Sequence, residues 1–147
     1  MKKNVMSTIL GLAAAAWLAP AHAAGQTTLT VELAGLKSSN GKVVLALFSS
    51  KNGFPAKIKN ASRRVSVSIK GRRARVVLKG LPRGTYAVAA FHDENGNGKL
   101  DTSWIGRPTE GVGMSNDARG HRGPPKFKDA SFKLDGSSKK IRIAIRY

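Results

Sequence analysis

Short runs in which apolar and polar residues alternate restrict most strongly how this chain folds. Alternation puts successive side chains on opposite faces of a β-strand, so each run predicts a strand with one buried face. Leu29, Val31 and Leu33 alternate in this way with polar neighbours. Alternation of this kind, or a continuous apolar run such as that at 43–48, predicts seven strands, near residues 28–33, 43–48, 64–70, 73–79, 86–91, 132–134 and 140–147.

Seven short strands separated by turn residues favour an all-β class and a single β-sandwich, of immunoglobulin-like or prealbumin-like type. Gly71-Arg72 predicts a tight hairpin turn between the third and fourth strands. No segment after Gly25 has helical spacing. Residues 24–147 suffice for one core and are too few for two ordinary domains. The chain has no cysteine, so packing, with or without a bound metal, must hold the domain together.

The first 23 residues have the pattern of a secretory signal peptide. Lys2 and Lys3 precede an apolar run at 5–18, and the Ala-His-Ala of residues 21–23 places small residues before a cleavage site. A transmembrane helix would need about 20 apolar residues, and this run is shorter. We therefore expect cleavage after residue 23, no transmembrane segment after signal removal, and export to the periplasm or the exterior.

The exported chain is strongly basic. Removing Lys2 and Lys3 from the 26 basic residues leaves 24 against 8 acidic residues, a net charge of +16. Such a charge attracts polyanions and anionic surfaces at long range. We do not expect nucleic acid as the partner, because the chain is predicted to be exported, its charge is scattered, and it lacks an aromatic stacking strip. We expect an anionic envelope polymer or surface as partner. The alternative is a solvated surface with no ligand, because the basic residues fall on the polar faces of strands.

The segment from Asp93 to Asp101 has the spacing of a loop that wraps a hard cation. Asp93, Asn95 and Asn97 place side-chain oxygens at alternate positions, and Gly98 stands where such loops bend sharply. The backbone carbonyl of Lys99 and the carboxylate of Asp101 complete the predicted calcium ligands. With two carboxylates in a cationic molecule, we expect an affinity of about 10⁻⁴–10⁻³ M.

Other interpretations of this loop stay open. Asn and Asp also form turns by accepting hydrogen bonds from their own backbone, so an Asx-rich turn without metal is the main alternative. An EF-hand would have a bidentate glutamate where this chain has Trp104, and its loop would lie between two helices. His92 neighbours the loop and His121 lies in the long segment, but the lack of cysteine and the hard oxygen ligands do not favour a transition metal. Glu110 is a candidate remote ligand.

Residues 102–127 form a long segment rich in Gly and Pro with little periodicity. Long segments of this kind inside a compact domain are usually functional or disordered. We expect an ordered excursion that begins at the cation loop and provides a contact surface. Its candidate contact residues are Trp104, Arg107, Glu110, Met114, Asn116, His121 and Phe127.

Several motifs together resemble one bacterial exported family. They are residues 41–48, 81–88, 92–101, 106–116 and 125–132. The family is the one catalogued as domain of unknown function 2141, and the resemblance covers nearly all of residues 24–147. It implies a small sandwich in the periplasm or on the envelope. It implies no activity, because the family has no established one.

A non-catalytic binding protein is the function that we expect from these features. The alternative is a small periplasmic hydrolase that uses the 102–127 loop as its site, with His121 or Glu110 central. Ser115 and His92 also supply the residue types of a hydrolytic triad, but neither stands in a nucleophile-elbow sequence.

Overall fold

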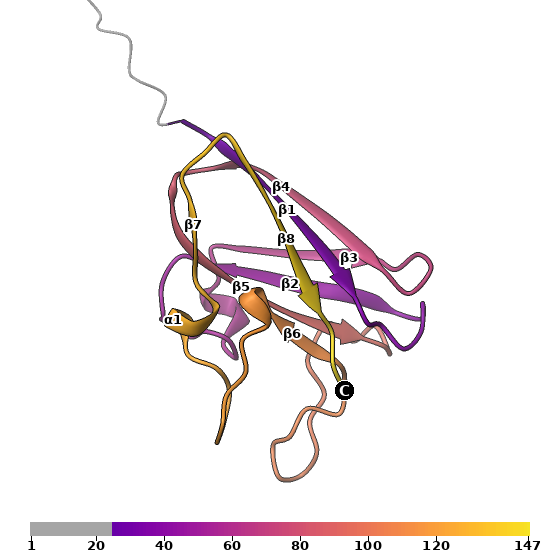
Figure 1. The fold of residues 1–147 in the computed structure, drawn as a ribbon. Coiled ribbons are helices and arrows are strands. Elements are labelled where there is room, and N and C mark those ends of the chain that lie inside the picture. Colours follow the sequence, from indigo (N-terminus) through magenta and orange to yellow (C-terminus); the bar gives the residue numbers. More distant parts are fainter. Residues whose placement is uncertain (1–24) are drawn as a thin grey trace, which may run out of the picture.

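Two β-sheets pack face to face, as the alternating pattern predicts (Figure 1). The computed structural model describes residues 25–147, so the predicted signal peptide at 1–23 lies outside the described residues. The smaller sheet has the strand order β4–β1–β8. Its central strand β1 (Thr27–Ala34) pairs antiparallel with β4 (Ala74–Leu81) and parallel with β8 (Ser138–Ala144).

The larger sheet has the order β3–β2–β5–β6, and β7 also pairs with β5. These strands are β2 (Lys42–Phe48), β3 (Arg63–Ser68), β5 (Gly84–Asp93), β6 (Val112–Met114) and β7 (Phe132–Leu134). All seven predicted strands are present. The continuous apolar run of β2 is central, between β3 and β5, and it is buried on both faces. That environment explains why its sequence does not alternate.

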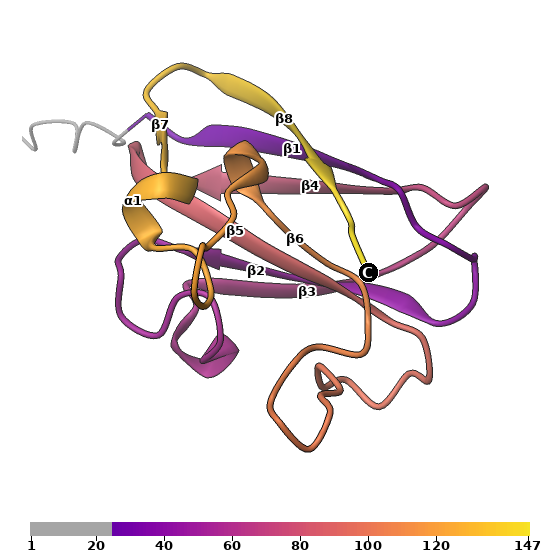
Figure 2. The same cartoon turned by 60° about the horizontal axis from the view of Figure 1, so that its bottom comes forward.

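The predicted turn at Gly71-Arg72 is present, but the strands that it joins enter different sheets. Lys70 and Arg73 exchange backbone hydrogen bonds of 2.9 and 3.0 Å across the turn. Both central residues have positive φ, 56° and 59°, as a type I′ turn requires. The strand before the turn, β3, belongs to the larger sheet, and the strand after it, β4, belongs to the smaller one (Figure 2). The hairpin therefore connects the two layers at one edge of the sandwich.

Within the described residues, β6 is a strand beyond the seven predicted. It lies inside residues 102–127, the segment in which the sequence shows little periodicity. It is only three residues long, too short to show alternation. Val112 and Arg146 exchange backbone hydrogen bonds of 2.8 and 2.9 Å, which link β6 to the chain beyond β8. Gly113 permits this approach, because a Cβ there would lie 2.6 Å from the carbonyl oxygen of Ala144. β6 thus joins the two sheets at the edge opposite the hairpin.

Helical structure in the described chain is limited to single turns. These are η1 (Ile58–Asn60), η2 (Ser115–Asp117) and α1 (Phe127–Ala130). None of the helices within residues 25–147 is both long and apolar enough to span a bilayer.

Apolar side chains form one large core between the sheets and a smaller cluster outside the larger sheet. The core includes Leu29, Val31, Leu33, Val43, Leu45, Leu47, Val76, Leu78, Val88, Leu134, Ile143 and Ile145. The outer cluster consists of Ala46, Phe48 and Ala89, covered by Phe54, Ile58, Ala61, Met114 and Phe127. Part of the long segment therefore packs onto the larger sheet.

Candidate metal centre and basic surfaces

The cation loop begins where β5 ends. Asp93, the last residue of that strand, is 2% exposed, and its Oδ2 accepts a 2.8 Å hydrogen bond from the Gly98 amide. Gly98 has φ of +74°, a conformation that favours glycine. The loop also contains two Asx turns. Asn95 Oδ1 accepts a hydrogen bond from the Asn97 amide at 3.1 Å, and Asn97 Oδ1 accepts one from the Lys99 amide at 2.8 Å.

Asp101 closes the loop. Its two carboxylate oxygens accept hydrogen bonds from the side-chain amides of Asn95 and Asn97, at 2.6 and 2.9 Å. The structure thus brings all five predicted ligand residues into one closed turn. The Asx turns of the alternative interpretation are present too. Each Asx turn uses one lone pair of an asparagine oxygen. Because an amide oxygen has two lone pairs, the second stays available to a cation.

One atom of this loop lacks a partner. Asp93 Oδ1 is buried and accepts no hydrogen bond from any described residue. Buried polar atoms are nearly always paired, so an orphaned carboxylate oxygen calls for an explanation such as an ion. No three His, Asp or Glu side chains within residues 25–147 converge as a metal site on their own. The oxygen donors here are two Asp carboxylates and two Asn amides, which suit a hard cation.

Glu110 returns from the long segment to the base of the loop. Its carboxylate is 6% exposed and accepts two backbone hydrogen bonds, from the Glu94 amide at 2.9 Å and from the Asp101 amide at 3.1 Å. Glu110 therefore reaches the loop as an acceptor for two of its backbone amides, and its role as a remote cation ligand stays a prediction. It holds the first and last turns of the loop together.

A second set of contacts fixes the strand end beside the loop. The buried His92 ring contacts the Tyr147 hydroxyl through Nδ1 and lies 2.7 Å from the Asn40 carbonyl oxygen through Nε2. Both ring nitrogens are therefore occupied. Lys37 pairs with Glu94 at 2.8 Å, and this hydrogen bond raises the pKa of the Lys37 ammonium. These contacts tie the segment beside the loop to Asn40, Tyr147 and Lys37.

Two loops of the long segment project from one end of the molecule (Figure 1). We call residues 101–109 the first finger and residues 118–126 the second finger. The first finger is a small hairpin: the Thr109 amide donates to the Asp101 carbonyl, and the Ser103 amide donates to the Arg107 carbonyl. At its tip Trp104 is 97% exposed and Ile105 is 54% exposed.

The remaining candidate contact residues lie in three different environments. Arg107 is exposed on the first finger and His121 on the second. Met114 and Phe127 are half-buried in the outer cluster, and Phe127 makes an edge contact with Phe54 at 5.8 Å. The side-chain amide of Asn116 donates to two backbone carbonyls beyond α1 and in its last turn. The structure does not gather the seven residues into one surface.

A cavity of about 930 Å³ lies between the fingers and the outer face of the larger sheet. Its floor is formed by Val44, Ala46, Ala89 and Phe91, which are only 1–7% exposed. Ile58 and Met114 of the outer cluster also line the cavity.

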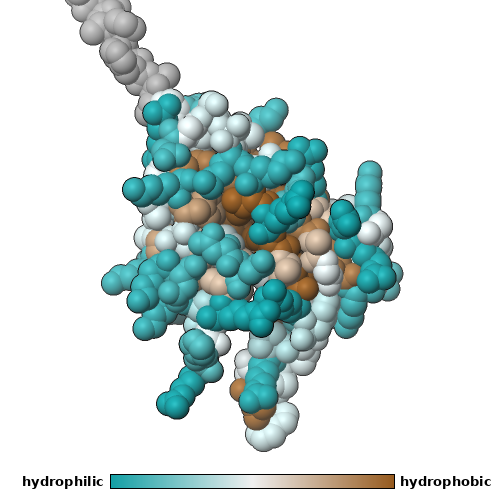
Figure 3. All heavy atoms as spheres, in the orientation of Figure 1, coloured by the Kyte–Doolittle hydropathy of each residue, from teal (hydrophilic) through white to brown (hydrophobic). Residues whose placement is uncertain are grey.

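The outer face of the smaller sheet is strongly basic. Figure 3 shows hydrophilic side chains around a hydrophobic area near the middle of one side of the molecule. Glu32 on β1 forms ion pairs with Lys140 and Arg142 on β8, both at 3.2 Å. The hydrogen bond to Lys140 is the main reason that the pKa of Glu32 is lowered, with Arg142 adding to it.

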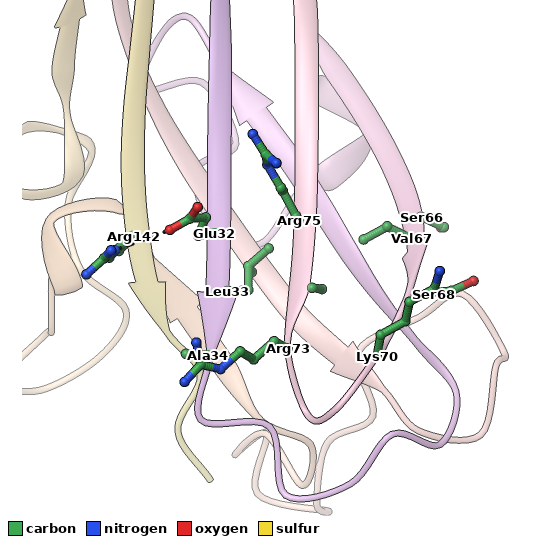
Figure 4. Close-up of a pocket in the computed structure, with 11 residues that line it drawn as sticks. Glu32, Leu33, Ala34, Ser66, Val67, Ser68, Lys70, Arg73, Arg75 and Arg142 are labelled. Carbon is green, nitrogen blue, oxygen red and sulfur yellow. Dashed lines mark hydrogen bonds and ion pairs between the residues drawn. The ribbon is translucent and has the colours of Figure 1, made fainter.

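Next to this face a cleft of about 1060 Å³ opens between β3 and β4 (Figure 4). Four of the side chains that line it are basic, and one is acidic. They are Lys70, Arg73, Arg75, Arg142 and Glu32. The sequence pattern places these residues on polar strand faces, but only the fold shows that they surround one cleft.

Ser115 and His92, which have residue types found in hydrolytic triads, are both engaged in contacts within the fold. Ser115 is fully buried, and its hydroxyl accepts from the Val88 amide at 2.9 Å and donates to the Ala130 carbonyl. His92 is engaged with Tyr147 and Asn40, as described above. Each of these two side chains thus has a structural explanation.

The chain belongs to a bacterial family of unknown function. The family model, described as "Uncharacterized protein conserved in bacteria (DUF2141)", matches residues 31–142. This match confirms the resemblance noted from the motifs. No curated protein and no solved structure matches the chain. The comparisons therefore define the family and leave the activity to be inferred from the site.

Sequence reasoning missed several residues that shape this site. Tyr147 contacts His92 across 55 residues, and nothing in a terminal tyrosine indicates such a contact. Ile105 is recognisable in the sequence as an apolar residue of the long segment, but its 54% exposure beside Trp104 becomes clear only in the structure. Arg119 and Arg122 on the second finger were also missed, and only the fold shows that Arg119 lines the same cavity as Arg107 of the first finger.

Proposed function

We propose that this protein is an exported, non-catalytic β-sandwich that binds calcium in the 93–101 loop and contacts an anionic component of the cell envelope. The orphaned Asp93 Oδ1 is the observation that carries the calcium part. A buried acceptor without a partner costs about 1–3 kcal/mol, and more when it is charged. A cation in the loop would remove that cost.

The rest of the loop supports a weak site. Asp101 would have to exchange its hydrogen bonds to Asn95 and Asn97 for contact with the ion. That exchange opposes binding, as does the basic charge of the molecule. The expected dissociation constant is therefore about 10⁻⁴–10⁻³ M, the range of extracellular calcium modules.

Thermal melting in calcium and in chelator tests this proposal. Both sheets and the core lie within residues 25–147, so a chain that starts at Ala24 contains the whole described fold. At about 10 mM calcium, binding at this affinity stabilises the folded state by about 1.4–2.7 kcal/mol. We expect calcium to raise the melting temperature more than magnesium does.

Asp93→Asn should remove the calcium effect. An asparagine keeps an acceptor for the Gly98 amide but removes the buried charge, so its stability in chelator should stay close to wild type. Asp135→Asn is the matched control, because Asp135 is an exposed acid far along the chain. An equal calcium shift in Asp93→Asn and in wild type would refute the site.

The cleft at β3 and β4 supports the anionic partner. Its basic side chains outnumber its single acid, and Glu32 is already paired with Lys140 and Arg142. A concave basic surface focuses an attractive field on a polyanion. We expect retention on an immobilised anionic polysaccharide that weakens steeply with salt.

The double variant Arg73→Gln, Arg75→Gln should elute at lower salt than wild type. Lys51→Gln with Lys57→Gln is the control, because it removes the same charge from an exposed loop outside the cleft. Equal shifts for the two double variants would mean that net charge alone, and not the cleft, determines retention.

A further inference from the structure

We propose that the first finger inserts Trp104 and Ile105 into the interfacial layer of an anionic phospholipid bilayer. This inference rests on the proposed envelope location and names the bilayer as a surface that the protein contacts. It starts from the finger tip, where Trp104 is 97% exposed and Ile105 is 54% exposed.

The chemistry of the turn is the first argument. The Gly106 amide donates to the Ser103 carbonyl at 2.8 Å, so Trp104 and Ile105 are the two central residues of a β-turn. Central turn positions are usually taken by Gly, Pro, Asn, Asp or Ser. The Trp104 side chain gains almost nothing from the fold because it is 97% exposed, and more than half of Ile105 is exposed as well. An external apolar contact would give them a role.

The finger is held in place for such a contact. The Asp101 carbonyl accepts from Thr109 at 2.9 Å, and the Asp101 amide donates to Glu110 at its base. Asp101 is also the last residue of the cation loop. Little ordering is therefore left for binding, and a preorganised element loses less free energy when it docks.

Charge around the tip favours an anionic surface. Arg107 is exposed on the first finger, and Arg119 and Arg122 are exposed on the second. Figure 1 shows both fingers leaving the same end of the molecule, and Figure 3 shows their tips as its outermost parts. Tryptophan prefers the membrane interface, where its ring is apolar and its N–H stays hydrated. Basic residues near it bind anionic headgroups.

Tryptophan fluorescence tests the proposal directly. The sequence has two tryptophans, Trp17 and Trp104, so a chain that starts at Ala24 reports on Trp104 alone. We would add vesicles of equal parts phosphatidylcholine and phosphatidylglycerol, in calcium. The emission of Trp104 should shift to shorter wavelength, and lipids brominated on their acyl chains should quench it. Vesicles of phosphatidylcholine alone should bind much more weakly.

Variants separate insertion from simple charge attraction. Trp104→Ser with Ile105→Ser should weaken vesicle sedimentation at least tenfold, because the apolar contact is lost. Val77→Ser is the matched control, since Val77 is 45% exposed on the opposite sheet and should have no effect. Arg107→Gln should weaken binding about fivefold.

Each outcome decides a different point. Vesicle binding without a blue shift, or full binding by the Trp104→Ser, Ile105→Ser variant, would overturn insertion. Retention on the anionic polysaccharide with no vesicle binding would also overturn it and leave the proposed function intact. Vesicle insertion without polysaccharide retention would support the bilayer contact and refute the proposal that the cleft binds a polyanion.

Discussion

Replacing Glu110 by glutamine should destabilise the fold far more than its position in an irregular segment indicates. The carboxylate accepts backbone hydrogen bonds of 2.9 and 3.1 Å from Glu94 and Asp101, and it is 6% exposed. Glutamine has one acceptor oxygen, so one of the two amides would face an NH₂ group. A hydrogen bond to a charged group contributes about 1.5–3 kcal/mol to stability, so the variant should lose a free energy of unfolding of this size.

For a domain of this size, about 2–3 kcal/mol corresponds to a fall in melting temperature of about 8–12 °C. The measurement is thermal and urea unfolding in chelator, which keeps any cation effect out of the comparison. Hydrogen exchange should show faster exchange of the Glu94 and Asp101 amides. Glu94→Gln is the control: its carboxylate pairs with an exposed lysine, Lys37, so it should lose much less stability than Glu110→Gln. Equal losses in the two variants would refute the role given to Glu110.

Two further predictions concern the edge of the sandwich and its basic face. Gly113→Ala should destabilise the fold by about 2 kcal/mol or more in urea unfolding, because its Cβ would lie 2.6 Å from the Ala144 carbonyl oxygen; an unchanged midpoint would contradict the close packing of β6 on β8. Lys140 and Arg142 lower the pKa of Glu32 below its ordinary value of 4.5, so its stabilising effect is present above that pH and is lost as pH falls through the lower folded value. Glu32→Gln should therefore lessen the acid dependence of stability, and an unchanged pH profile would show that these pairs contribute nothing.

Strand periodicity predicted most of the fold because most strands have one buried and one exposed face. The strand β2, which does not alternate because it is buried on both faces, was predicted instead from its continuous apolar run. Two features escaped these patterns. A three-residue strand such as β6 is too short for a pattern, and a turn such as Gly71-Arg72 does not reveal that its strands enter different sheets. Both depend on contacts between distant parts of the chain.

The candidate site was predictable where its signal was local. The spacing from Asp93 to Asp101 described one loop, and the structure brings those residues together. The long segment was less predictable, because its residues serve separate roles in the fingers and the outer cluster. The contact of Tyr147 with His92 and the grouping of basic residues around the cleft arise only from the packed sheets.

Calorimetric titration of calcium into the chain from Ala24 to Tyr147 decides whether the 93–101 loop is a metal site. One ion should bind per chain with a dissociation constant of about 10⁻⁴–10⁻³ M, and this binding should be lost in Asp93→Asn. Magnesium should bind more weakly. Absence of calcium binding, or binding that Asp93→Asn leaves unchanged, would refute the metal site and make the loop an Asx turn held by its own hydrogen bonds.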